Sequence, residues 1–323
     1  MYDGTLQYLS PLDELVLMKQ DFAQVGWDEQ LVDDLRQLIR LAVREDLDRY
    51  CDWTTVSLVP QDAKGKANIV SREHGIISGL AAIQEGIDEL NADLQISLHA
   101  KDGDQVEPKS VVATLSGSAR DILTTERILL NLVGRCSGIA SLTRQFVDLV
   151  SHTKVRIYDT RKTTPGWRRL EKWAVGTGGG TNHRAGLYAA VMIKDNHLAH
   201  SEDVGITPAQ AVTRAREFLK QASNDTPIAK EMIVQVEVDT IEQLKLVASA
   251  KPDIVLLDNM SCEQLVECVQ FRDDEAQGIE LEASGGVNLS TVKGIAETGV
   301  DRVSIGALTH SATNFDVGLD WLD

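Results

Sequence analysis

Residues 154–197 combine the side chains that a pocket for a strongly anionic small molecule requires. The stretch holds nine Lys or Arg against three Asp or Glu, a local charge of +6, in a chain whose formal charge is −17. A cationic island in an acidic protein favours a local anion site, because a nucleic-acid surface more often makes a whole domain basic. The candidates are Arg161, Lys162, Arg184 and Lys194, with Arg127 from an earlier segment.

These cations divide by their chemistry. Arginine suits planar, bidentate recognition of a carboxylate, whereas lysine acts as a point charge on phosphate or carboxylate. Arg161, Arg184 and Arg127 are therefore candidates for holding a dicarboxylate, and Lys162 and Lys194 for neutralising phosphates or a carboxylate. The alternative for any one of them is a solvated surface charge.

Other members of the stretch have plainer interpretations. Arg168, Arg169 and Lys172 are expected on a solvated helical face. His183 has no Ser or Cys nucleophile in a triad-like context, which favours an orienting role over that of a general base. The glycine-rich run 176–183 is neither a dinucleotide-binding nor a Walker motif, and we assign it to substrate approach or a mobile loop.

Two carboxylates lie in apolar segments of the second half of the chain. Glu237 and Asp258 belong to VQVEVDT and IVLLDN. A carboxylate in such a run is costly unless it is paired or metal-bound, although each could simply end its strand in solvent. Two acids at matching positions favour a site that holds Mg²⁺ or binds ribose hydroxyls.

Glycine-containing loops follow the next two apolar segments. Ser284, Gly285 and Gly286 come after one segment, and Ser304 and Gly306 end the next. Turns of this kind expose backbone N–H groups, and a following helix adds partial positive charge. One such loop would be weak evidence, but two in successive units predict a phosphate site.

The composition excludes several classes of protein. The 323 residues are 43% hydrophobic and 25% charged, which is typical of a globular protein with an ample core. No window approaches the roughly 18 apolar residues of a membrane span, and no secretory pattern begins the chain. Four cysteines without metal-site spacing indicate reduced thiols, so we expect a cytoplasmic protein. Its acidity argues against nucleic acid or membranes as partners.

The first half of the chain is expected to form a small α+β domain. Periodic leucines predict a helix over 27–47, and 48–60 is expected to be a connecting segment. Short strands and turns over 66–115 enclose a helix at 81–90. A long helix is predicted from about 123 to 150.

The second half alternates between strand and helix. Strands are predicted at 232–240, 253–259, 279–286 and 301–307, each of the first three followed by a helix. Such units form parallel strands with right-handed crossovers. The polar residues at the strand ends would then share one mouth, as in a β/α barrel.

Six motifs carry a resemblance to a known family. They are DTRKTTPG, GGGTNHRAGLYAAVMIKDNH, VEVDT, LLDNMS, LEASGGVNL and DRVSIGALTHS. With the earlier LAVREDLDRYCDWTT and TTERILLNLVGRCSGIASLT, they resemble the quinolinate phosphoribosyltransferase family, the carboxylating nicotinate-nucleotide pyrophosphorylases of NAD biosynthesis. The match runs from about residue 36 to 320 in one order and spacing.

The resemblance implies an α/β architecture, an open β/α barrel with a smaller N-terminal α/β sandwich domain. We expect the sandwich over 31–145, joined by the C-terminal segment 308–323, and the barrel over 146–307. Residues 1–30 would be a leader of unknown role. A head-to-tail homodimer is also implied, with a hexamer left open.

The resemblance further implies transfer of phosphoribose from phosphoribosyl pyrophosphate (PRPP) to quinolinate with decarboxylation. The products would be nicotinate mononucleotide, CO₂ and pyrophosphate. Quinolinate is expected at Arg161, His183, Arg184 and Lys194, and Arg127 would reach the neighbouring subunit's site. PRPP and Mg²⁺ are expected around Lys162, Glu237, Asp258, Ser284, Gly285, Gly286, Ser304 and Gly306. Lys162, Glu237 and Asp258 would be catalytic, and the two acids would bind the metal.

Two other functions remain open. A divergent pyrophosphorylase of the same family could act on another acid, although the complete Arg/His/Lys set argues against it. A non-catalytic phosphate-binding protein would be expected to lack acids such as Glu237 and Asp258, and both are present.

Overall fold

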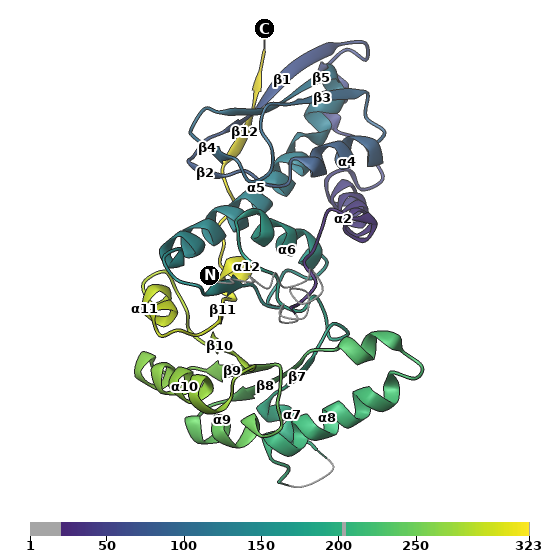
Figure 1. The fold of residues 1–323 in the computed structure, drawn as a ribbon. Helices are drawn as coiled ribbons and strands as arrows, with labels where there is room; N and C mark the ends of the chain where they lie inside the picture. The colour runs from purple at the N-terminus through teal and green to yellow at the C-terminus, as the bar shows by residue number, and fades with distance from the viewer. Residues whose placement is uncertain (1–20, 202–204, 323) are drawn as a thin grey trace, which may run out of the picture.

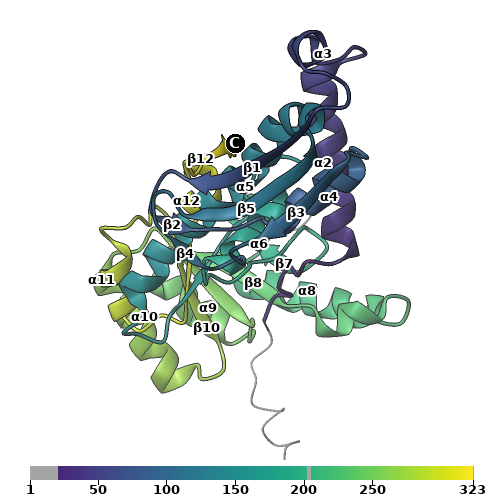
Figure 2. The ribbon, with the colours of Figure 1, turned by 90° about the horizontal axis from the view of Figure 1, so that it is seen from above.

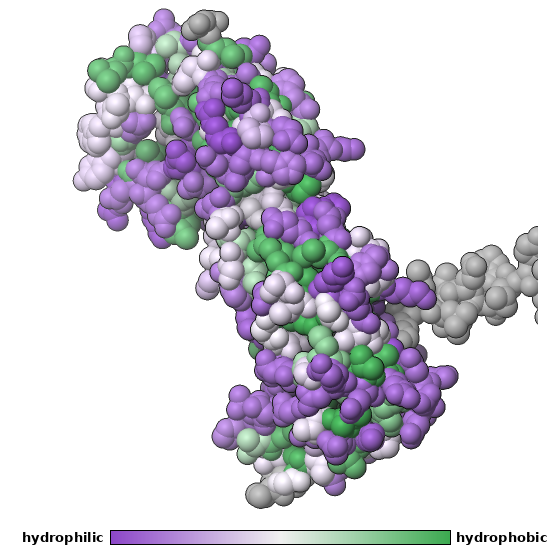
Figure 3. All heavy atoms as spheres, turned by 90° about the vertical axis from the view of Figure 1, so that its left-hand side faces the viewer, coloured by the Kyte–Doolittle hydropathy of each residue, from purple (hydrophilic) through white to green (hydrophobic). Residues whose placement is uncertain are grey.

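The computed structural model describes residues 21–201 and 205–322. An antiparallel sheet lies at one end of the molecule and a parallel sheet at the other, with helices α5 (Ala119–Val150) and α6 (Arg168–Thr177) between them (Figure 1). The parallel sheet with its helices and the smaller antiparallel domain confirm the predicted α/β fold class. On the face drawn in Figure 3, hydrophilic residues cover much of both ends.

The antiparallel sheet has the strand order β12-β1-β5-β3. Its strands are β1 (Lys64–Ser71), β3 (Leu94–Leu98), β5 (Val111–Ser118) and β12 (Val317–Trp321), while β2 (Gly75–Ile76) and β4 (Gln105–Val106) form a separate pair. Strand β12 comes from the C-terminus and pairs with β1, from Ala67 opposite Trp321 to Ser71 opposite Val317. The end of the chain is therefore part of the N-terminal sheet.

Helices α4 (Ala81–Glu89) and α5 (Ala119–Val150) pack against one side of this sheet. Helices α2 (Glu29–Leu47) and α3 (Trp53–Leu58) pack on other helices, α2 on α4 and α3 on α5. Seen from above, the sheet lies over α5, and α2 runs beside α4 (Figure 2). Helix α2 is amphipathic as predicted, with Leu31, Leu35 and Ile39 buried. The prediction that 48–60 is only a connecting segment was wrong, because a six-residue helix capped by Asp52 lies within it. This helix is too short for its apolar residues to show helical periodicity in the sequence.

Helix α5 spans 32 residues and joins the two halves of the molecule. It begins about four residues before the predicted start, because the Ser118 side chain accepts the N–H of Asp121 and caps the helix. Gly134 and Gly138 lie where the chain after the barrel crosses the helix, and Phe315 N donates to Gly134 O at 2.8 Å. A Cβ atom on Gly138 would lie 1.9 Å from the carbonyl oxygen of Thr313.

The second half of the chain contains a parallel sheet with the order β6-β11-β10-β9-β8-β7. Its strands are β6 (Arg156–Tyr158), β7 (Val191–Ile193), β8 (Val234–Val238), β9 (Ile254–Asp258), β10 (Glu280–Ser284) and β11 (Arg302–Ser304). The helices are α6 (Arg168–Thr177), α7 (Asp195–Ala199), α8 (Pro208–Ala222), α9 (Ile241–Ala248), α10 (Cys262–Glu275), α11 (Val292–Glu297) and α12 (Ala307–His310), with a 3₁₀ turn at Pro227–Glu231. Strands β6 and β7 are the two edges, so the barrel is open.

Apolar residues from all six strands form the core of this half. Val236, Val255, Leu281 and Val303 are fully buried on β8 to β11. No helix within 21–201 or 205–322 is long and apolar enough to cross a bilayer.

The close crossing on α5 gives a testable prediction. Gly138→Ala should lower the free energy of unfolding by about 3 kcal/mol, because the new methyl group must displace the backbone near Thr313. Gly176→Ala on α6 is the matched control, since nothing lies within 4 Å of its added Cβ. That change should raise stability by about 0.5 kcal/mol through helix propensity. Urea denaturation measures both, and equal effects would contradict the packing described.

Candidate active site

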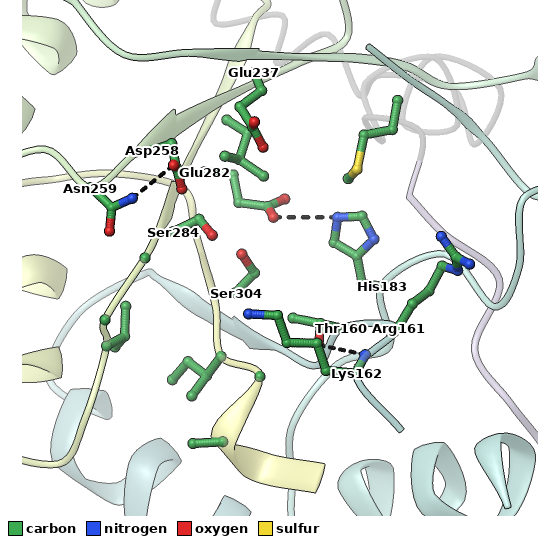
Figure 4. A pocket seen from close by; sticks show the side chains of 18 of the residues that line it. Thr160, Arg161, Lys162, His183, Glu237, Asp258, Asn259, Glu282, Ser284 and Ser304 are labelled. Carbon is green, nitrogen blue, oxygen red and sulfur yellow. Dashed lines mark hydrogen bonds and ion pairs between the residues drawn. The ribbon is translucent and has the colours of Figure 1, made fainter. Parts of the chain in front are cut away.

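A cavity of about 810 Å³ lies at the carboxyl ends of the parallel strands. Its walls come from the ends of β6 to β11 and the loops that follow them (Figure 4). A volume of this size suits small-molecule ligands, which occupy pockets of roughly 300–1,000 Å³. The carboxyl ends of barrel strands are also where active sites lie in this architecture.

Twelve of the thirteen residues chosen from the sequence line this cavity. They are Arg161, Lys162, His183, Arg184, Lys194, Glu237, Asp258, Ser284, Gly285, Gly286, Ser304 and Gly306. Arg127 is exposed on α5 and is not among the lining residues. The structure thus brings the predicted set into one place, whereas the individual roles remain predictions.

Opposite charges occupy different walls of the cavity. The carboxylates of Glu237, Asp258 and Glu282 lie on one side, and Arg161 and Lys162 extend from the other (Figure 4). Glu237 accepts a hydrogen bond from Lys194 Nζ, and Asp258 accepts one from Asn259 Nδ2 at 2.8 Å. The cavity can therefore meet an anion on one wall and hydroxyls or a cation on the other.

Arg161 and Arg184 form the cationic wall. Neither forms an ion pair with a carboxylate in the described parts of the chain. Arg184 is buried and donates from Nη1 to Ala190 O at 3.1 Å. Burial and then the charge of Arg161 lower the pKa of the Arg184 guanidinium. Two neighbouring guanidinium groups without carboxylate partners repel each other until an anion binds between them.

Glu282 is a site residue that the sequence interpretation missed. It is fully buried on β10, and its Oε1 lies 3.3 Å from Nε2 of His183. Burial favours its neutral form, but the nearby His183 and Arg302 outweigh burial and hold the pKa of this carboxyl below its usual range. The signal was present in LEASGG, an acid in an apolar strand like Glu237.

A buried ion pair positions the His183 loop. Lys172 Nζ donates to Asp159 Oδ1 and, at 2.8 Å, to the carbonyl oxygen of His183. The same Asp159 oxygen accepts His183 N at 2.8 Å, and its other oxygen accepts Asn182 Nδ2 at 2.9 Å. Desolvation lowers the pKa of Lys172 and raises the pKa of Asp159, and their mutual attraction opposes both shifts.

The prediction of a solvated face on α6 was wrong. Lys172 is fully buried because it shares a face of α6 with buried Val175 and pairs there with Asp159, the residue after β6. Arg168 is half-buried and donates from Nε to Thr163 Oγ1 at 3.0 Å. Arg169 pairs with Asp34 at 3.3 Å, which ties α6 to α2.

The glycine-rich run also differs from its prediction. Gly178 and Gly180 pack against α5, where an added Cβ on Gly178 would lie 2.5 Å from Ala140 O. On Gly180 it would lie 2.8 Å from Thr143 Cγ2. These glycines do not line the cavity, so they serve close packing rather than substrate approach.

The loop that carries Arg161 and Lys162 is held from three helices. Glu171 of α6 is fully buried, and its Oε2 accepts Thr164 N at 3.2 Å. Its Oε1 accepts Arg135 Nη2 of α5 at 2.7 Å. From α12, Thr309 Oγ1 donates to Lys162 O at 2.7 Å. The backbone that presents both cations is therefore fixed before substrate arrives.

Glycine allows close approach at two points on the loops after β10 and β11, and at Gly285 its positive φ requires it. Gly285 has φ +98°, and an added Cβ would lie 2.1 Å from Asn259 Oδ1. An added Cβ on Gly306 would lie 2.9 Å from Lys162 Cδ. These loops can bring backbone N–H groups close to a ligand in the cavity.

Fold and cavity together define a class of protein. It is an α/β-barrel enzyme whose site, at the carboxyl ends of the strands, is built for a small molecule with several negative charges.

Comparison with known proteins identifies the family within that class. Residues 52–137 match the quinolinate phosphoribosyl transferase N-terminal domain, and residues 139–320 match the C-terminal domain of the same family. The chain belongs to the quinolinate phosphoribosyltransferase family, as its motifs predicted.

Individual relatives agree with this assignment. The chain is 40% identical over 290 residues to the carboxylating nicotinate-nucleotide pyrophosphorylase of Mycobacterium leprae, covering 89% of this chain and 97% of the relative. A probable enzyme of the same name from Bacillus subtilis is 40% identical over 286 residues, covering 88% and 93%. The solved structure of the Francisella tularensis nicotinate-nucleotide pyrophosphorylase superposes with a TM-score of 0.82 at 34% identity, covering 94% of this chain and all of that one.

The buried ion pair gives the second prediction. Lys172→Met should destabilise the protein by about 3–5 kcal/mol, because Asp159 is then left buried without the cation that offsets its desolvation. Arg169→Met on the same helix should cost at most about 1 kcal/mol, since its pair with Asp34 is partly exposed. Chemical denaturation provides the comparison. A loss below about 1 kcal/mol for Lys172→Met would show that the pair is not needed.

Proposed function

We propose that this chain transfers the phosphoribosyl group of PRPP to quinolinate and decarboxylates the product. Nicotinate mononucleotide, CO₂ and pyrophosphate are the products, as for carboxylating nicotinate-nucleotide pyrophosphorylases. The observation that carries the proposal is the pair Arg161 and Arg184, which face one cavity without carboxylate partners in the described residues. Membership of the family is the first support for this substrate. The second is that these two guanidinium groups can each bind one of the two carboxylates of quinolinate.

In the proposed reaction the pyridine nitrogen of quinolinate attacks C1 of the ribose. The bond from C1 to the pyrophosphate oxygen breaks, and its electron pair leaves with pyrophosphate. Lys162 supports the proposal here, because its exposed ammonium lies in the cavity and can stabilise the leaving charge. The C2–carboxylate bond then breaks, the pyridinium stabilises the carbanion at C2, and a proton from solvent completes the product.

The chain's contribution is positioning and electrostatics. Arg161, Arg184 and His183 would hold the carboxylates of quinolinate, and the loops of Gly285 and Gly306 would receive the phosphates of PRPP. Selectivity follows from the same wall, because nicotinate lacks the 2-carboxylate and would leave a guanidinium group unmatched.

We also propose Mg²⁺ as the cofactor. Glu237 and Asp258 both line the cavity, and the described residues contain no cluster of three or more His, Cys, Asp or Glu suited to a metal. Two carboxylates fit a Mg²⁺ ion that takes its remaining ligands from substrate phosphates and water. When bound there, the ion would neutralise charge on pyrophosphate.

We further propose that the protein acts as a homodimer and that it is located in the cytoplasm. Arg127 supports a shared site, because it is an exposed arginine outside the cavity of its own chain. A second copy could supply it across the interface. The four free cysteines agree with a reducing compartment.

The third prediction tests the reaction directly. Purified protein with Mg²⁺ and PRPP should release CO₂ and form nicotinate mononucleotide from quinolinate, and should form no product from nicotinate. Arg161→Ala should lower kcat/KM for quinolinate by about 100-fold through loss of a charge-assisted contact. Chelation of Mg²⁺ should stop turnover. Product from another acid, but none from quinolinate, would favour a divergent member of the family. PRPP binding without turnover would favour a non-catalytic protein.

The fourth prediction tests the shared site. Arg127→Ala and Lys162→Ala variants should each be inactive alone. Unfolding and refolding them together should restore activity, because mixed dimers contain one site in which neither substitution is present. Activity that stays absent in mixtures shown by light scattering to be dimeric would contradict a contribution of Arg127 from the second copy.

A further inference from the structure

Residues 21–25 lie beneath the candidate active site. Asp21 is held at the amino ends of the parallel strands, opposite the cavity. Its Oδ2 accepts Arg156 Nη1 at 2.5 Å and the Tyr158 hydroxyl at 2.7 Å, and its Oδ1 accepts Arg302 Nη1 at 2.9 Å. Arg156 and Arg302 are the first residues of β6 and β11, so one carboxylate joins an edge strand to its neighbour.

Phe22 enters the barrel next to this anchor. It is 5% exposed and clusters with Tyr158, Ala190, Ile233 and Ile254, which come from four different strands or their approaches. Its ring centroid lies 4.3 Å from that of His183, at an interplanar angle of 31°. Phe22 therefore fills part of the interior of the open barrel, although it comes from the segment before the first helix and not from a barrel strand.

Gln24 and Val25 bind the residue before His183. Gln24 Oε1 accepts Asn182 N at 2.7 Å, and Gln24 Nε2 donates to Asn182 O at 3.3 Å. Val25 N donates to Asn182 Oδ1 at 2.8 Å. Together with the side-chain bonds of Asn182 to Asp159 and Lys172, these contacts hold both its backbone and its side chain.

His183 is thus enclosed on several sides. Phe22 lies against one face, the Tyr158 ring meets it edge-on at 6.4 Å, and Glu282 lies 3.3 Å from Nε2. The imidazole still lines the cavity while being 4% exposed. Its orientation toward a ligand therefore depends on what supports it from below.

We propose that residues 21–25 are a positioning segment that sets the His183 ring for binding the acceptor acid. This inference rests on the proposed function. It assigns a role in substrate affinity to Phe22 and Gln24, neither of which lines the cavity. A segment that only stabilised the barrel would affect unfolding without distinguishing between the two substrates.

The test compares two variants that disturb the segment differently. Phe22→Leu keeps an apolar side chain but removes the ring against His183, and Gln24→Ala removes the contacts with Asn182. Each should raise KM for quinolinate about tenfold, with KM for PRPP and kcat changed less than about twofold. Phe218→Ala is the control, because Phe218 is 67% exposed on α8. It should leave all three constants unchanged.

Thermal unfolding and quinolinate calorimetry on the same samples complete the test. Loss of quinolinate affinity in protein that is folded at the assay temperature supports the inference. Unchanged quinolinate constants in both variants, or equal losses for quinolinate and PRPP, would overturn it while leaving the proposed function intact. A wild-type protein that does not turn over quinolinate would instead overturn the proposed function, and this inference with it.

Discussion

The buried pair of Lys172 and Asp159 is the interaction on which the site depends. Replacing a buried ion pair by apolar residues is often neutral, so its net contribution to stability is small even though losing one partner is costly. Its contribution is positional. It ties α6 to the end of β6 and, through Asn182 and the backbone of His183, fixes the loop that carries Arg184. The cationic wall of the cavity is built on this loop.

Several independent contacts converge on the same loop and its neighbour. Gly178 and Gly180 let α6 end tightly against α5, and Glu171 links Arg135 to the backbone before Pro165. From below, Gln24 pairs with Asn182. A site that relies on electrostatics must hold its charges in place before substrate binds, and buried hydrogen bonds provide that preorganisation.

Local chemistry in the sequence predicted much of this site. Arginine, lysine and histidine types, two acids at strand ends and two glycine loops identified twelve of the 21 residues that line the cavity. The acids and the glycine loops could be placed because β8 to β11 are clear apolar segments. The failures concern contacts between distant segments. Lys172 looks like a surface charge until α6 is seen against β6, and nothing local in Asp21 or Phe22 reveals the barrel above them. Glu282 differs, since the reasoning applied to Glu237 would have found it.

A crystal structure of the protein with bound quinolinate would test the account most directly. We expect its two carboxylates to lie within hydrogen-bond distance of the guanidinium groups of Arg161 and Arg184, with the pyridine nitrogen directed toward the wall of Glu237 and Asp258. Quinolinate bound at the loops of Gly285 and Gly306, with both arginines free of it, would contradict the division of the cavity into an acceptor wall and a phosphate wall.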